Sequence, residues 1–122
     1  MKIAITATGD TLDDQVDGRF GRCSFFIIYD LEADSFEAVA NEAQTAGGGA
    51  GVQAVQTVQQ QGVEVVLTGN AGPRAVAAFQ AAEIQFVTGV SGSVRDAVKN
   101  YRSGAYKPAD GASVDSHYGI GR

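Results

Sequence analysis

The residues from Val16 to Cys23 carry the side chains best suited to chemistry in this sequence. They read Val-Asp-Gly-Arg-Phe-Gly-Arg-Cys and include two arginines, two glycines and the only cysteine of the chain. A guanidinium group presents charged N–H donors in a fixed fork, which suits oxyanions and sulfur-rich anions. A thiol beside such a cation favours its thiolate form, so Cys23 is a candidate soft-metal ligand and is expected to be partly accessible. The alternative is a hairpin entry in which Arg19 and Arg22 lie on the surface and Cys23 is a small buried hydrophobe.

Three predicted strands end in the same dipeptide, Thr-Gly, at residues 8–9, 68–69 and 88–89. Each pair taken singly is ordinary turn chemistry. Ligands of open parallel sheets bind outside the carboxyl ends of the strands, so these turns and residues 16–23 are predicted to share one pocket. Helices are expected to begin after two of the turns and to direct free N–H groups at the same anion. The candidate ligand-binding residues are Arg19, Gly21, Arg22, Gly69, Asn70, Gly72, Arg74, Ser91 and Arg95.

Hydrophobic patterning predicts the elements that hold these residues in place. Strands are expected over residues 2–8, 24–31, 36–40, 63–68 and 84–88, and helices over 52–60, 73–82 and 94–102. Right-handed crossovers make the first, fourth and fifth strands parallel and leave the hairpin at one edge. The predicted fold is therefore an α/β three-layer sandwich, in which a mixed five-stranded sheet has helices on both faces.

The length of 122 residues suits a single domain, which we place at residues 1–106. Residues 10–18 contain four acids and little apolar content, so this stretch is expected to be a mobile loop. Residues 107–122 are polar and rich in glycine, and they include the only histidine, His117. We expect them to form a flexible C-terminal tail that can be removed without loss of the fold.

Composition disfavours several classes of function. A net charge of −5 argues against general nucleic-acid binding. Since we find no signal-peptide pattern and no apolar run near the ~20 residues that span a bilayer, we expect a cytoplasmic protein without membrane contact. One cysteine cannot build a four-cysteine metal site, so a cluster would be supplied ready-made, shared between chains or completed by other ligands. A monomer or weak dimer is expected.

Four segments, at residues 17–26, 49–56, 63–75 and 92–98, resemble the dinitrogenase iron–molybdenum cofactor biosynthesis domain family. The most specific parts are Arg-Phe-Gly-Arg at residues 19–22 and Thr-Gly-Asn-Ala-Gly-Pro at residues 68–73. This family includes the nitrogenase accessory proteins NifX and NafY, the C-terminal domain of NifB, and small stand-alone proteins. The resemblance extends over roughly residues 1–106.

The resemblance implies a ribonuclease H-like fold and non-catalytic binding of metal–sulfur clusters, such as the iron–molybdenum cofactor or its precursors. A related small protein binds a molybdenum–copper sulfide cluster. The chain is thus expected to carry an anionic Fe-Mo-S or Mo-Cu-S cluster in cluster assembly or delivery, with assembly or acceptor proteins as partners. The sequence departs from the family at Arg74, where members often have asparagine, and in the loop 41–47, which lacks the histidine of some members.

Two other functions stay open at this point. A phosphate- or nucleotide-binding regulatory module would need the same arginines and turns. A metal-dependent nuclease or phosphotransfer enzyme could use Asp10 and its neighbours Asp13, Asp14 and Asp17. The enzyme is disfavoured because the spacing of these acids matches no defined metal-binding loop and no base–nucleophile pair is recognisable.

Overall fold

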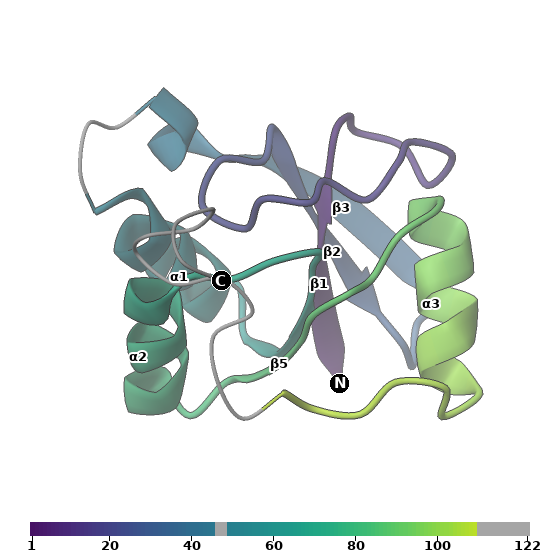
Figure 1. Cartoon of the computed structure of the whole chain (residues 1–122). Coiled ribbons are helices and arrows are strands. Elements are labelled where there is room, and N and C mark those ends of the chain that lie inside the picture. The colour runs from purple at the N-terminus through teal and green to yellow at the C-terminus, as the bar shows by residue number, and fades with distance from the viewer. Residues whose placement is uncertain (46–48, 110–122) are drawn as a thin grey trace.

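The computed structural model describes residues 1–45 and 49–109 and shows a central sheet with helices on both sides (Figure 1). The strands are β1 (Lys2–Ala7), β2 (Phe25–Asp30), β3 (Ser35–Ala40), β4 (Val63–Leu67) and β5 (Gln85–Val87). The helices are α1 (Ala50–Gln60), α2 (Pro73–Ala82), α3 (Val94–Arg102) and the short 3-10 helix η1 (Glu42–Thr45). All the predicted strands and helices are present, and within the described residues η1 is the one element that was not predicted.

The sheet has the order β3-β2-β1-β4-β5. Strand β1 is parallel to β4, and β4 is parallel to β5. Strands β1, β2 and β3 are joined antiparallel, so the hairpin occupies one edge. The predicted mixed five-stranded sheet is therefore confirmed, and the carboxyl ends of β1, β4 and β5 meet at one side of it.

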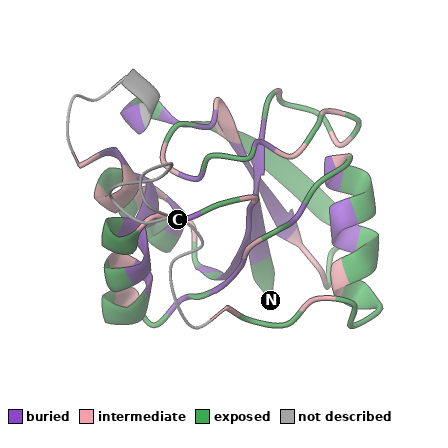
Figure 2. Ribbon diagram, viewed as in Figure 1, coloured by how far each residue is buried: buried purple, intermediate pink, exposed green. Residues whose placement is uncertain are grey.

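Two apolar clusters cover the two faces of the sheet. Under α1 and α2, Phe20 packs against Phe26 and Phe79, with ring centroids 5.7 Å and 4.8 Å apart, and Phe79 stacks on Phe86. On the other face, α3 buries its apolar residues, including Val94, against β1 and β4. The central strands are buried from both sides (Figure 2). Helices lie on both faces, as the sequence predicted.

The three helices begin in different ways. At α3 the side chain of Ser93 accepts a hydrogen bond from the backbone N–H of Asp96 at 3.1 Å, which confirms the predicted cap. Helix α1 follows Gly49, whose φ of 76° lies in the left-handed region, and α2 follows Gly72. Within residues 1–45 and 49–109, neither glycine-led helix receives a side-chain cap. The positive ends of α1 and α2 are thus less compensated than that of α3.

The acidic loop over residues 10–18 is fixed by its backbone, so the prediction that it is mobile is wrong. The N–H of Val16 donates to Gly92 O at 2.8 Å, and the N–H of Asp17 donates to Thr6 O at 2.9 Å. The N–H of Thr8 donates to Gln15 O at 3.0 Å. The bonds to Gly92 and Thr6 join the loop to residues outside it, so the composition of the loop could not reveal them.

The described chain ends against the core. The backbone N–H of Ala109 donates to Phe86 O in β5 at 2.7 Å, and Ala109 packs on the cluster beneath α1 and α2. The predicted tail, residues 107–122, thus begins with residues attached to the edge of the sheet. Residues 110–122, with His117, lie outside the described residues.

Candidate functional site

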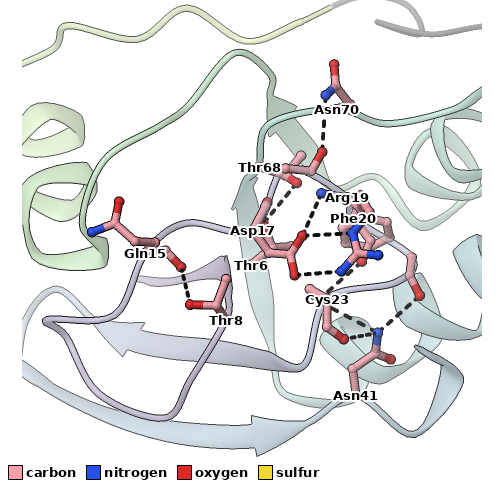
Figure 3. A network of polar contacts seen from close by, with 12 residues as sticks. Thr6, Thr8, Gln15, Asp17, Arg19, Phe20, Cys23, Asn41, Thr68 and Asn70 are labelled. Carbon is pink, nitrogen blue, oxygen red and sulfur yellow. Dashed lines mark hydrogen bonds and ion pairs between the residues drawn. The ribbon is translucent and has the colours of Figure 1, made fainter. Parts of the chain in front are cut away.

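The basic segment, residues 16–23, crosses the carboxyl ends of β1 and β4 and contacts the turn after β4 (Figure 3). The side-chain amide of Asn70 donates to Gly18 O at 3.2 Å, and the N–H of Phe20 donates to Asn70 O at 3.2 Å. A Cβ at Gly69 would lie 2.6 Å from Gly18 Cα, so the two backbones approach as closely as only glycine allows. The structure thus brings Arg19 beside the Thr-Gly-Asn turn, as predicted.

The same segment also lies against the first turn of α1, which itself packs on the first turn of α2. A Cβ built on Gly21 would be 3.0 Å from the backbone nitrogen of Gly51 in α1. A Cβ built on Gly51 would in turn lie 3.3 Å from Cβ of Ala75 in α2. The N-terminus of α1 therefore meets the basic segment directly, and that of α2 lies beside α1 and follows the turn that pairs with Arg19. The positive ends of these helices favour negative charge on this side of the molecule.

Asp17 is a site residue that sequence reasoning did not single out as part of the pocket. It is 5% exposed, and its Oδ1 accepts the backbone N–H of Arg19 at 3.0 Å and Nε of Arg19 at 3.2 Å. The second carboxylate oxygen accepts Nη2 at 3.4 Å. This pairing raises the pKa of Arg19. The Arg19 side chain is still 69% exposed, so Asp17 orients the guanidinium without covering it.

Hydroxyl groups tie the basic segment to the strand ends (Figure 3). Thr6 Oγ1 donates to Asp17 O at 2.8 Å and lies 2.9 Å from Thr68 Oγ1. Because the Thr6 hydroxyl has one proton, Thr68 is the donor in the second bond. Both threonines are fully buried. This chain of bonds joins β1, the turn after β4 and Asp17 into one rigid support.

Cys23 lies inside the protein, so the expectation that it is accessible is wrong. Its exposure is 0%, and the thiol donates to Phe20 O at 3.3 Å. Burial, with a smaller contribution from the charge of Asp17, raises the pKa of the thiol to about 12. The thiol is desolvated because Phe20 and Cys23 turn inward while Arg19 and Arg22 stay exposed.

Asn41 holds the far end of the basic segment and is a second residue that the sequence did not reveal. Its side-chain N–H groups donate to Gly21 O at 3.1 Å and Cys23 O at 2.9 Å. Its Oδ1 accepts the N–H of Ala43 at 3.1 Å. The sequence shows only an asparagine directly after a predicted strand, and its burial, which obliges the amide to find partners, appears only in the structure.

Arg74 is the second residue of α2 and is exposed. It lines a groove of about 520 Å³ between α1 and α2, together with residues such as Val52, Gln56 and Ala77. Arg74 therefore lies in the first turn of α2, two residues after Gly72, at the groove between the two helices.

Arg95 lies on the other side of the sheet in the first turn of α3, and Ser91 belongs to the turn that precedes this helix. The N–H groups of Val94 and Arg95 donate to Asp14 O and Leu12 O, both at 2.9 Å. Arg95 Nε also lies 3.2 Å from a carboxylate oxygen of Asp13. The start of α3 is occupied by the acidic loop, and the predicted single pocket divides into two regions.

Within residues 1–45 and 49–109, no helix has the length and apolar character needed to cross a membrane. In the same part of the chain, no group of three or more His, Cys, Asp or Glu side chains is placed to hold a metal ion.

Comparisons with known proteins bear on this arrangement. A family model described as "Dinitrogenase iron-molybdenum cofactor" matches residues 1–104. The apo form of the orange protein from Desulfovibrio gigas is 41% identical, with a TM-score of 0.89 over 92% of this chain and 95% of that one. An NMR structure of "a putative NifB protein" from Thermotoga is 32% identical, with a TM-score of 0.77 over 88% and 91%. An uncharacterized protein of Methanocaldococcus jannaschii is 26% identical over 107 residues, 85% of this chain and 87% of that protein.

Proposed function

Because this chain belongs to the dinitrogenase iron–molybdenum cofactor family, we propose that it binds an anionic metal–sulfur cluster without catalysing a reaction and acts in cluster assembly or delivery. The observation that carries this proposal is the contact of the basic segment with the first turn of α1 and with the turn that leads into α2. The likeness to a protein solved in an apo form, the orange protein, supports a cargo-binding role.

The proposed surface consists of Arg19, Gly21, Arg22, Gly69, Asn70, Gly72 and Arg74. Guanidinium groups would balance the charge of the cluster, and backbone N–H groups would donate to its sulfides. Close packing at Gly69 and Gly21 keeps the backbones of three separate segments within reach of one ligand. A rigid, concentrated set of donors suits an anion whose charge is spread over several sulfur atoms.

Asp17 would act on the cargo through Arg19. It engages Nε and Nη2 of the guanidinium from the buried side, which leaves the other N–H donors free to meet a ligand. Orientation before binding reduces the entropy lost when the ligand arrives. The negative charge of Asp17 also repels an anionic ligand. Binding therefore relies on directed N–H donors in addition to the positive charge of the arginines.

The buried thiol of Cys23 leads us to propose noncovalent binding. A protonated thiol is a weak metal ligand, and ligation would require the basic segment to leave the core. The proposed cargo is therefore an assembled Fe-Mo-S or Mo-Cu-S cluster received from an assembly protein and passed to an acceptor protein in the cytoplasm.

Titration with tetrathiomolybdate under anaerobic conditions tests the proposal. Arg19→Ala and Arg74→Ala should each weaken binding roughly tenfold or more, since a charge-assisted contact is worth about 1.5–3 kcal/mol. Arg95→Ala is the matched control, because it also removes one exposed guanidinium group, but from the far side of the sheet. Equal losses in all three variants would indicate diffuse electrostatics and would refute a localised site.

A phosphate- or nucleotide-binding module is the second candidate, because the same donors suit phosphate oxygens. Competition by inorganic phosphate and ATP separates the two functions. If either displaced tetrathiomolybdate at a concentration comparable to that of tetrathiomolybdate itself, the hypothesis of a phosphate- or nucleotide-binding module would be preferred.

A further inference from the structure

Strand β3 has one edge that no part of the described chain covers. It ends the strand order, and its six residues are exposed except Val39, which is half-buried (Figure 2). Its sequence, Ser-Phe-Glu-Ala-Val-Ala, contains one charge and no proline or lysine. Edge strands usually carry such residues, or a bulge, to prevent pairing with another strand. The β2–β3 register is also regular throughout, so no bulge protects this edge.

The backbone groups that face outward on β3 can be assigned from the register. The N–H of Asn41 donates to Ser24 O at 3.0 Å, so this pair is hydrogen-bonded. Hydrogen-bonded and non-hydrogen-bonded pairs alternate along an antiparallel ladder. The N–H and C=O groups of residues 35, 37 and 39 therefore face β2. Those of Phe36, Ala38 and Ala40 point away from the sheet.

These outward groups are complementary to a second copy of themselves. If two β3 strands run antiparallel about a two-fold axis at Ala38, Ala38 faces its own copy and Phe36 faces Ala40 of the other copy. Each of these pairs exchanges two N–H···O bonds. Glu37 then lies opposite Val39. A register centred on Glu37 would place two carboxylates directly opposite each other and is disfavoured.

Side chains on one face of the strand fit the same register. Phe36 is 39% exposed and lies across from Tyr29, on the face that α3 covers farther along the sheet. In the paired arrangement, its ring would lie over Ala40 of the other copy, which is itself across from Phe25. Pairing would thus cover the exposed apolar row Phe36, Ala38 and Ala40.

We propose that two copies of this chain associate through β3, antiparallel about Ala38, so that their two sheets become continuous. The net charge of −5 on each copy opposes this contact, so the dimer should be weak and strengthened by salt. The inference does not depend on the cluster.

Disulfide trapping tests the register directly. In Ala38→Cys, the two sulfur-bearing residues would face each other in a hydrogen-bonded pair about 5.5 Å apart at Cα, which suits a disulfide. The native Cys23 is fully buried and does not compete. Mild oxidation should yield a covalent dimer of Ala38→Cys, and much less of Glu37→Cys or of the collision control Lys99→Cys. Equal yields from all three, or a higher yield from Glu37→Cys, would overturn the proposed pairing.

A second variant tests the association without oxidation. The N–H of residue 38 points away from β2, so Ala38→Pro removes only the donor needed by the second copy. Sedimentation in high salt should show concentration-dependent dimers of the wild-type chain and only monomers of Ala38→Pro, with similar melting temperatures. A wild-type chain that stays monomeric at millimolar concentration, or a proline variant that dimerises equally, would refute the proposal.

Discussion

Raising the pH from about 8 to about 11 should destabilise the wild-type protein more than a Cys23→Ala variant. Burial raises the pKa of Cys23 from 9.0 to about 12 in the folded protein. The unfolded chain releases this proton near its ordinary pKa, whereas the folded chain retains it. The stabilising contribution is therefore complete below about pH 9 and is lost as the pH rises towards 12. Each pH unit in this window costs on the order of 1 kcal/mol, so roughly 2–3 kcal/mol should be lost by pH 11.

Denaturant unfolding of both proteins at several pH values measures this effect. The Cys23→Ala variant keeps Tyr29 and all the lysines, which also titrate at high pH. The difference between the two curves of unfolding free energy against pH therefore reports the ionisation of the thiol alone. Their free energies of unfolding should run parallel below about pH 9 and diverge above it. In the same samples, a thiol reagent should label native wild-type protein at pH 8 only as fast as the protein opens.

Two results would refute this reasoning. Parallel stability curves up to pH 11 would mean that the folded and unfolded thiols ionise alike. Labelling of the native protein at the rate of a free cysteine would mean that Cys23 reaches solvent, and direct ligation of a metal would return as a possibility.

Three further predictions concern stability. Gly69→Ala should cost about 1–3 kcal/mol, because its Cβ would meet Gly18 Cα at 2.6 Å, whereas a Cβ at Gly72 meets nothing within 4 Å; equal midpoints for Gly69→Ala and Gly72→Ala in urea would contradict this close contact. Ser93→Ala should lower the free energy of unfolding by about 1 kcal/mol through loss of the α3 cap, and an unchanged urea midpoint would show that the cap is redundant. A chain ending at residue 106 should melt below one ending at residue 109, because it lacks the Ala109–Phe86 hydrogen bond, worth about 1 kcal/mol; identical melting curves would restore the boundary expected from the sequence.

Patterning along the chain was sufficient to predict the elements and their order. The limits of α2 and α3 match those expected, because Pro73 and Ser93 mark helix starts by local chemistry. The parallel core of the sheet followed from the alternation of strands and helices. The meeting of the basic segment with the turn after β4 followed in turn, since the carboxyl ends of parallel strands share one side of a sheet.

The positions of individual side chains within the site could not be predicted in this way. Arg19 and Arg95 both lie beside turns. Arg19 pairs with the buried Asp17, whereas Arg95 pairs with the exposed Asp13 on the other side of the sheet. Their separation depends on which face of the sheet α3 covers, and local spacing along the chain does not determine that face.

What the sequence alone determined is the set of elements, their topology and the gathering of one basic segment with glycine-rich turns, because those follow from periodicity and chain connectivity. Only the tertiary structure decided that Cys23 is sealed and protonated, that Asp17 orients Arg19, and that the acidic loop is fixed. Each of these outcomes depends on desolvation or on hydrogen bonds between residues far apart in the chain. Such contacts exist only once the chain has folded.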